Sequence, residues 1–300
     1  IAVLPLFAAS VLTEEAVTIR GVPAISDALC MAQILRELGA EVTFSGGDVT
    51  IDSASSCSHE IPPSLTRELR SSVFMLGSLL TRFRRAVIAY PGGCDIGLRP
   101  IDMHLGALRR LGVRIDEEDG YIFCRCEKLK GAEISLDFPS VGATETLLLA
   151  AVCARGTTVL RGAAREPEIS DLTEFLNRCG GRIEGAGTST LRIEGRRGLS
   201  GCDFSPLPDR IFASTLACAA AAAGGRVELT GCPPALYAPV LEILEQMGCT
   251  VKRGADRAEI ARFGRLYGVG RVFTGVYPGL ATDAAPLLAA AMLCAEGESS

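Results

Sequence analysis

Residues 87–112 read VIAYPGGCDIGLRPIDMHLGALRRLG: a short alternating strand, a loop, an amphipathic helix and a closing glycine. Three other segments follow the same order, at residues 17–39, 159–180 and 227–248. The closing glycines follow one another at nearly equal spacing, and they are Gly39, Gly112, Gly180 and Gly248. Glycine often follows a helix because the chain there turns left-handed, which only glycine does without strain. The regular spacing therefore predicts one supersecondary unit repeated along the chain.

Two further features complete the repeated unit. A strand pair with a Gly-rich turn follows each of the first three glycines, at residues 41–52, 114–125 and 182–195. Helices of small apolar residues are expected at residues 4–15, 71–83, 143–156, 210–225 and 283–297. Such helices are usually buried on most sides. The sequence thus predicts an α/β (α+β) fold of stacked βαβαββ units, with the helices inside and the sheets outside.

Length and charge limit the possible classes of function. A chain of 300 residues is too long for one ordinary core, so two domains are expected. The net charge of −5 and the absence of Trp leave no basic field for nucleic acid. No apolar run reaches the ~18 residues of a membrane span, and residues 1–12 lack the basic start of a signal peptide. We expect a cytoplasmic protein with neither nucleic acid nor membrane as a partner. A small anionic ligand is still possible, because the local placement of arginines, rather than the net charge, decides whether an anion binds.

The cysteines favour free thiols. The 12 cysteines are scattered through apolar stretches, which is typical of buried thiols in a reducing cytoplasm. Cys124 and Cys126 would share one face of a strand, but a zinc site needs four donors, and His59 and His104 are the only histidines. The G-x-G of the third strand pair lacks the strand-to-helix context of a dinucleotide motif. No metal or organic cofactor is expected.

The second segment departs from the others in its loop. Residues 91–100 read PGGCDIGLRP, and three glycines in this loop let the backbone approach a ligand closely. Cys94 is expected to be more accessible than the other cysteines, and Arg99 would favour its thiolate and offer a forked donor set for phosphate or carboxylate. The alternative is a plain turn before a helix that begins at Pro100, with Cys94 as a small apolar filler.

The stretch PGGCDIGLRPID resembles the signature loop of the UDP-N-acetylglucosamine enolpyruvyl transferases (1-carboxyvinyltransferases), within the EPSP synthase-like superfamily. Other stretches fall in the order of that family, among them LRSSVFMLGSLLTRF, LKGAEISLDFPSVGATET, LPDRIFAST and YPGLATDAAP. The resemblance covers the whole chain. It implies a two-lobed, inside-out α/β barrel whose cleft closes on the substrates. The reaction would transfer enolpyruvate from phosphoenolpyruvate to UDP-N-acetylglucosamine in peptidoglycan synthesis, without a cofactor or a protein partner.

The resemblance also implies catalytic roles. Cys94 would be the acid that protonates C3 of phosphoenolpyruvate, and the thiol attacked by fosfomycin. Asp283 would be the base for the sugar hydroxyl; its alternative is the N-cap of the apolar helix that follows. Arg99 would contact phosphoenolpyruvate, and Arg70 would lie in the same anion-binding cluster. The alternative for Arg70 is a solvated helix charge.

A nucleotide-sugar pocket follows from the same resemblance. Ser140, Val141 and Gly142 open a helix, and the N–H groups of a helix start suit phosphate; without the family this is a Ser-capped helix. Asp209 and Arg210 would lie where the chain crosses between lobes, or would simply cap a helix. The residues expected to line the uracil-nucleotide pocket are Pro100, Ile101, Asp102, Met103 and His104.

The resemblance assigns residues 1–207 to a lobe of three units with the Cys94 loop and the nucleotide-sugar pocket. Residues 208–300 would be a partial second lobe with Asp283. The chain begins after the place of a family Lys-Asn pair and ends before further arginines, and Phe138 stands where many relatives have a basic residue. We therefore expect a fragment that is itself nearly inactive. The alternatives are a non-catalytic UDP-sugar-binding paralogue and shikimate-type transfer, which the PGGC loop disfavours.

Overall fold

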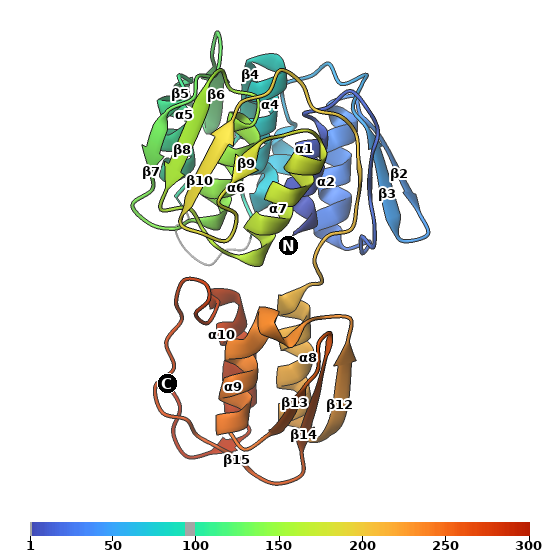
Figure 1. Cartoon of the computed structure of the whole chain (residues 1–300), viewed down its shortest axis with the longest axis vertical. Coiled ribbons are helices and arrows are strands. Elements are labelled where there is room, and N and C mark those ends of the chain that lie inside the picture. The colour runs from blue at the N-terminus through green and yellow to red at the C-terminus, as the bar shows by residue number, and fades with distance from the viewer. Residues whose placement is uncertain (1, 94–99) are drawn as a thin grey trace. The chain divides into compact units, whose positions relative to one another are not determined.

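The computed structural model describes residues 2–93 and 100–300. The chain divides into two compact units, residues 1–207 and residues 208–300. Each unit has a hydrophobic core of its own, and no residue belongs to both cores. The two units are coloured from blue to yellow and from yellow to red in Figure 1.

Two sets of helices fill the first unit. The inner helices are α1 (Val3–Ser10), α4 (Met75–Phe83) and α6 (Val141–Ala151), which contact one another. After each inner helix and the strand that follows it, the chain forms an amphipathic helix: α2 (Ser26–Glu37), α5 (Asp102–Arg110) and α7 (Pro167–Arg178). Two short elements, α3 (Pro63–Glu68) and the 3₁₀ helix η1 (Arg70–Phe74), precede α4. All eight residues of α1 and nine of α6 are buried, so these helices form the centre of the unit.

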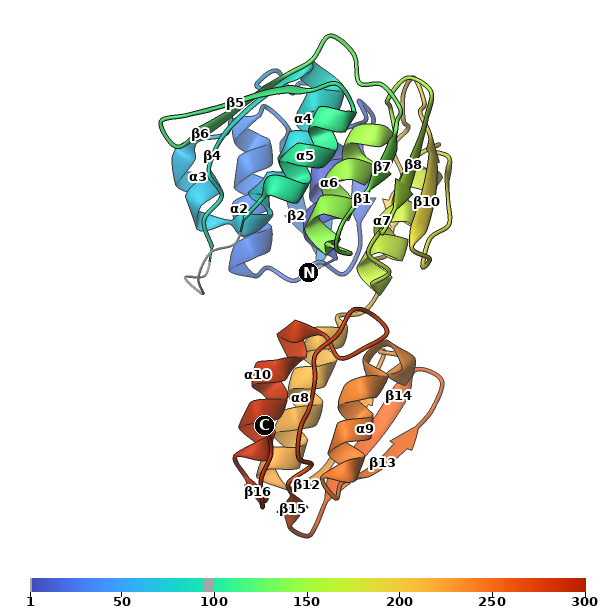
Figure 2. The same ribbon diagram turned by 90° about the vertical axis from the view of Figure 1, so that its left-hand side faces the viewer.

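Three sheets surround these helices (Figures 1 and 2). The first has the order β11-β1-β3-β2, the second β4-β6-β5 and the third β7-β8-β10-β9. Each contains an antiparallel strand pair of the predicted kind, such as β2 with β3. The strands are β1 (Val17–Ile19), β2 (Glu41–Ser45), β3 (Asp48–Asp52), β4 (Arg85–Ala89), β5 (Arg114–Glu118), β6 (Tyr121–Arg125), β7 (Glu133–Ser135), β8 (Thr157–Arg161), β9 (Ile183–Glu184), β10 (Thr190–Glu194) and β11 (Asp203–Phe204).

The predicted glycine positions explain how each outer helix ends. All four closing glycines have a positive φ, between 93° and 104°, and residues with a Cβ rarely adopt such a backbone conformation. Gly77 has a different role, because a Cβ there would lie 2.4 Å from the carbonyl oxygen of Thr146. Glycine at this position therefore allows α4 and α6 to pack closely.

The second unit repeats the pattern once. Helix α8 (Arg210–Ala223) leads into the antiparallel sheet β12-β14-β13, and α9 (Ala238–Gln246) and α10 (Ala285–Met292) pack around α8. The remaining elements are β12 (Gly225–Thr230), β13 (Thr250–Arg253), β14 (Arg257–Arg262), β15 (Leu266–Tyr267), β16 (Ala295–Glu296), η2 (Pro234–Tyr237) and η3 (Thr282–Ala284).

The structure confirms the predicted α/β fold class, with two corrections. The small-residue helices of the second unit are not buried on most sides: Phe212 of α8 is 62% exposed and Leu293, just after α10, is 88% exposed. Small apolar composition indicates that a helix can be buried, but neighbouring elements decide whether it is. The helix after the Gly-rich loop begins at Asp102, not at Pro100. None of the described helices is long and apolar enough to cross a membrane.

Candidate active site

Arg70 joins the two ends of the Gly-rich loop. Its Nη1 donates to the carbonyl oxygen of Pro91 at 3.3 Å, and its Nη2 donates to that of Pro100 at 3.3 Å. The side chain is only partly exposed, so the alternative of a solvated helix charge is wrong for Arg70. Cys94 and Arg99 lie between these prolines in sequence and outside the described residues.

The start of the loop is docked on α3 by its backbone. The N–H groups of Gly92 and Gly93 donate to the carbonyl oxygens of Thr66 and Arg67, at 3.0 and 3.2 Å. A Cβ on Gly92 would lie 1.8 Å from the Arg67 oxygen, so only glycine allows this approach. The glycines thus position the segment that leads into Cys94.

His104 is held against the start of α6. Its Nδ1 lies 3.0 Å from Thr146 Oγ1, and a Cβ on Gly142 would lie 2.9 Å from its Cε1. The imidazole is 7% exposed, and burial, assisted by the positive charge of Arg70, lowers its pKa to about 4. His104 is therefore neutral at physiological pH, and the contact with Gly142 fixes α5 against α6 (Figure 2).

The N-terminus of α6 is capped as the sequence predicts. Ser140 Oγ accepts a hydrogen bond from the N–H of Ala143 at 3.3 Å. The N–H groups of Val141 and Gly142 belong to the first turn, where they and the helix dipole favour an anion. The exposed Phe138 lies directly before this turn, and its carbonyl oxygen accepts from the N–H of Ser140 at 2.7 Å.

The predicted pocket residues of the first unit therefore gather at one place. Arg70 contacts Pro100, and His104 contacts Gly142 at the turn that Ser140 caps. Ile101 differs from the others, because its side chain is 4% exposed and belongs to the hydrophobic core. Its contribution to a pocket is limited to its backbone. Asp102 is exposed and Met103 is half-buried on the first turn of α5.

Sequence reasoning missed a buried carboxyl group beside this cluster. Glu145 of α6 is 1% exposed, and burial, followed by the nearby Glu168, raises its pKa well above the usual range. It precedes Thr146, the partner of His104. The signal was present in the sequence, because Glu145 is the single acidic residue in the mostly apolar stretch 143–156.

Asp283 lies in the second unit, within the 3₁₀ turn η3 that leads into α10. Its side chain is exposed, and within the described residues it makes no capping hydrogen bond to α10, so the N-cap alternative is wrong. A cavity of about 220 Å³ in the same unit is lined by residues on both sides of Asp283, including Leu280, Ala281 and Ala284.

Asp209 caps a helix, as its alternative interpretation predicts. Its Oδ1 accepts from the N–H groups of Ile211 and Phe212, at 2.9 and 3.0 Å. Such bonds satisfy the first free donors of α8. Arg210 begins the helix and lines the cavity beside η3.

Comparisons with known proteins show the family of this chain. Residues 1–300 match the family EPSP synthase (3-phosphoshikimate 1-carboxyvinyltransferase). The UDP-N-acetylglucosamine 1-carboxyvinyltransferase 2 of Caldanaerobacter subterraneus subsp. tengcongensis is 44% identical over 297 residues, which are 99% of this chain and 71% of that protein. The UDP-N-acetylglucosamine 1-carboxyvinyltransferase of Solidesulfovibrio magneticus is 44% identical over 299 residues, covering 100% of this chain and 72% of that protein.

Solved structures show the same fold. The crystal structure of the enolpyruvyl transferase NikO from Streptomyces tendae matches with a TM-score of 0.86 at 26% identity, over 99% of this chain and 71% of that chain. EPSP synthase from Acinetobacter baumannii matches with a TM-score of 0.69 at 23% identity, over 99% and 69% of the two chains, and this likeness concerns the fold alone. The chain belongs to the EPSP synthase family and, within it, to the UDP-N-acetylglucosamine 1-carboxyvinyltransferases.

Proposed function

We propose that this chain transfers the enolpyruvyl group of phosphoenolpyruvate to the 3′-hydroxyl of UDP-N-acetylglucosamine and releases phosphate. This reaction is a step of peptidoglycan synthesis. The family supplies the reaction class, and the relatives named for UDP-N-acetylglucosamine supply the acceptor. The observation that carries the site is Arg70, which holds both ends of the loop containing Cys94 and Arg99. The same relatives do not favour the non-catalytic alternative, because they are named as transferases.

The proposed addition step uses one acid and one base. The Cys94 thiol gives its proton to C3 of phosphoenolpyruvate, while the 3′-oxygen of the sugar forms a bond to C2. The proton of that hydroxyl passes to the Asp283 carboxylate. C2 then carries both the sugar oxygen and the phosphate oxygen. Each group transfers a proton as a reacting carbon or oxygen changes charge, which is general acid–base catalysis.

The elimination step restores the double bond. A proton returns from C3 to the Cys94 thiolate, the bond between C2 and the phosphate oxygen breaks, and phosphate leaves with the electron pair of that bond and takes up the proton that Asp283 received. Arg70 and Arg99 are proposed to bind the phosphate and carboxylate groups, because a guanidinium presents paired donors to both. Preorganised cations of this kind stabilise the charge that develops on the leaving group.

The acceptor is proposed to bind at the start of α6. The free N–H groups of Val141 and Gly142 suit the diphosphate, next to the Ser140 cap. Residues 100–104 would border the uracil nucleotide, with His104 kept neutral by burial and hydrogen-bonded to Thr146. We also propose that the protein acts in the cytoplasm, where its 11 described free cysteines stay reduced.

The acceptor can be tested on the full-length protein by measuring phosphate release from phosphoenolpyruvate with UDP-N-acetylglucosamine, with shikimate 3-phosphate, and with neither. We expect release only with the nucleotide sugar, and a product whose mass is that of the sugar nucleotide plus one enolpyruvyl group. Release with shikimate 3-phosphate alone would replace the proposal by shikimate-type transfer. A folded protein that binds the nucleotide sugar without releasing phosphate would establish the non-catalytic alternative.

A further inference from the structure

A second cavity opens in the first unit and is rich in cationic side chains. Its volume is about 1010 Å³, and it is lined by parts of residues 12–15, 81–84, 128–129, 153–156 and 195–199. Two carboxylates contribute, Glu14 and Glu15. The cationic lining residues are Arg82, Arg84, Lys128, Arg155, Arg196 and Arg197. Positive charge thus gathers here although the whole chain carries a net charge of −5.

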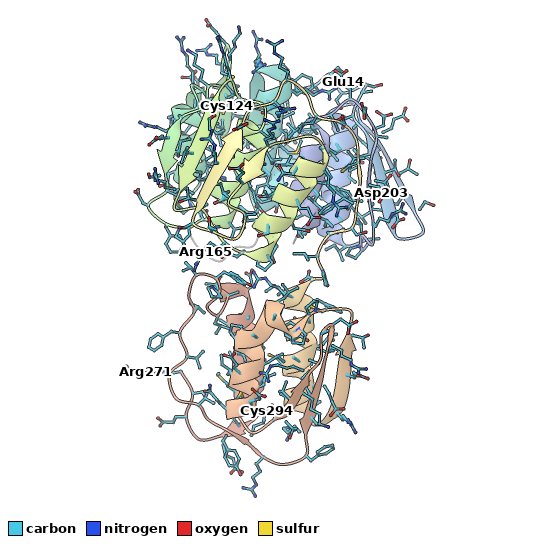
Figure 3. The ribbon with its side chains drawn as sticks, viewed as in Figure 1. Glu14, Cys124, Arg165, Asp203, Arg271 and Cys294 are labelled. Atoms are coloured by element: carbon cyan, nitrogen blue, oxygen red, sulfur yellow. The ribbon has the colours of Figure 1, made fainter. Side chains whose placement is uncertain are left out.

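This cavity lies at the opposite end of the inner helices from the candidate active site. Helix α6 begins beside the Ser140 cap and ends at Ala151, next to the cavity residues 153–156. Its 11 residues span ~16 Å along the axis. Helix α4 runs the same way, from η1 with Arg70 to the cavity residues 81–84. Figure 3 shows Glu14, on the cavity, and Arg165, which precedes α7, at opposite ends of this unit.

Two other side chains already satisfy the helix ends beside this cavity. The C-terminus of a helix attracts cations and donors because its last carbonyl groups are free. Arg82 donates to the carbonyl oxygen of Val11, the C-cap of α1, at 3.0 Å, and also to that of Ser53, which follows β3, at 2.7 Å. Thr81 Oγ1 donates to the carbonyl oxygen of Leu149 at 3.0 Å. Arg82 and Thr81 therefore satisfy free carbonyl groups at the helix ends. The other cationic side chains at the cavity are not needed for this purpose.

The five remaining cations have no anionic partner within the part of the chain that the structure describes. Their side chains make no hydrogen bond or ion pair there, and all five are exposed: Arg84, Lys128, Arg155, Arg196 and Arg197. Glu15 is engaged elsewhere, since its Oε2 accepts from the N–H of Gly201 at 2.9 Å. Like charges around one cavity repel one another, and an anion inside it would convert this repulsion into attraction.

We propose that this cavity binds a small phosphorylated metabolite with more than one phosphate group, at a site separate from the active site. Four of the five cations are arginines, whose paired N–H donors match phosphate oxygens. The cavity volume lies at the upper end of the range for small-molecule sites and exceeds what a single phosphate fills. The ligand therefore has an organic body or a chain of phosphates that reaches cations on several segments.

The test is a calorimetric titration with inorganic tripolyphosphate as the probe, in the presence of saturating UDP-N-acetylglucosamine to occupy the active site. We expect saturable binding of one probe per chain. The double variant R196A/R197A and the double variant K128A/R155A should each weaken it at least tenfold. Arg257→Ala, which alters an exposed arginine of β14 in the other unit, is the control and should leave the affinity unchanged.

Two results would overturn the proposal. One is the absence of saturable binding at millimolar probe. The other is an equal loss of affinity in Arg257→Ala and in the cavity variants, which would indicate only a diffuse attraction to surface charge. Circular dichroism of each variant shows whether it is folded, and the second double variant keeps the test decisive if the first is not.

Discussion

Arg70 connects residues that the sequence keeps far apart. Its guanidinium reaches carbonyl groups 21 and 30 positions further along the chain. A lone arginine at the start of a helix gives no local sign of such a role, so sequence alone favoured a solvated charge. Ser140, in contrast, was predictable, because its capping partner lies three positions away. The site residues that depend on local contacts can be predicted from the sequence, and those that depend on distant contacts cannot.

A conservative change at Arg70 should affect the reaction. Lysine keeps the charge but lacks the fork that reaches both Pro91 and Pro100. We expect Arg70→Lys to raise the KM for phosphoenolpyruvate at least tenfold and to lower kcat as well. Steady-state phosphate release measures both. Arg67→Lys, three residues earlier and exposed, is the matched control, and an equal effect there would remove Arg70 from the site.

His104 should make folding stability depend on pH. Burial lowers its pKa from an ordinary 6.5 to about 4, so between these values the unfolded chain binds a proton that the folded chain does not. The free energy of unfolding is therefore unaffected by this group above pH 6.5. As the pH falls from 6.5 toward 4, protonation of the unfolded chain lowers it by about 3 kcal/mol in total.

Urea unfolding at pH 7 and at pH 4.5 measures this contribution. The loss of stability between the two pH values should be smaller in His104→Gln, whose amide can still bond Thr146. His59→Gln replaces the only other histidine and should retain the full loss. If His104→Gln and the unchanged protein lose the same free energy, the imidazole is not buried as described.

At the scale of elements, glycine has two distinct effects in neighbouring helices. A Cβ on Gly77 would meet the Thr146 oxygen at 2.4 Å and Leu149 Cβ at 2.9 Å, whereas a Cβ on Gly106 of α5 would meet nothing within 4 Å. We expect Gly77→Ala to destabilise the protein by about 2 kcal/mol through overpacking. Gly106→Ala should be neutral or stabilising, by up to ~1 kcal/mol, because alanine favours helix. Thermal or urea unfolding of the two variants measures these changes. Equal effects on stability would show that α4 and α6 do not pack closely.

The elements also show how far sequence reasoning reaches. The closing glycines and the strand pairs such as β5 with β6 were predictable, because their signals are local and repeat at regular spacing. The burial of small-residue helices was predictable only in the first unit. Helix α6 lies among neighbours on all sides, whereas α10 has two buried residues. Both helices are rich in alanine and leucine, so the difference lies in the elements that surround each helix, which the local sequence does not indicate.

At the scale of the whole molecule, two separate cores predict separable unfolding. Leu148 is fully buried in the core of the first unit, and Leu241 in that of the second. Each Leu→Ala change should cost about 3 kcal/mol in its own unit. In calorimetry we expect two unfolding transitions. Leu241→Ala should lower the transition temperature of the second unit, and Leu148→Ala that of the first. A single transition that both variants shift equally would show that the units unfold as one.

The central claim is that this chain carries an enolpyruvyl transferase site in which Cys94 is the acid. The most direct test is phosphate release from phosphoenolpyruvate in the presence of UDP-N-acetylglucosamine, measured on the full-length protein, on Cys94→Ala and on Cys57→Ala, which alters an exposed cysteine elsewhere. We predict release that requires the nucleotide sugar, that falls at least a thousandfold in Cys94→Ala and that is unchanged in Cys57→Ala. Undiminished release in Cys94→Ala would contradict the assignment of the acid, and no release from any of the three folded proteins would contradict the function itself.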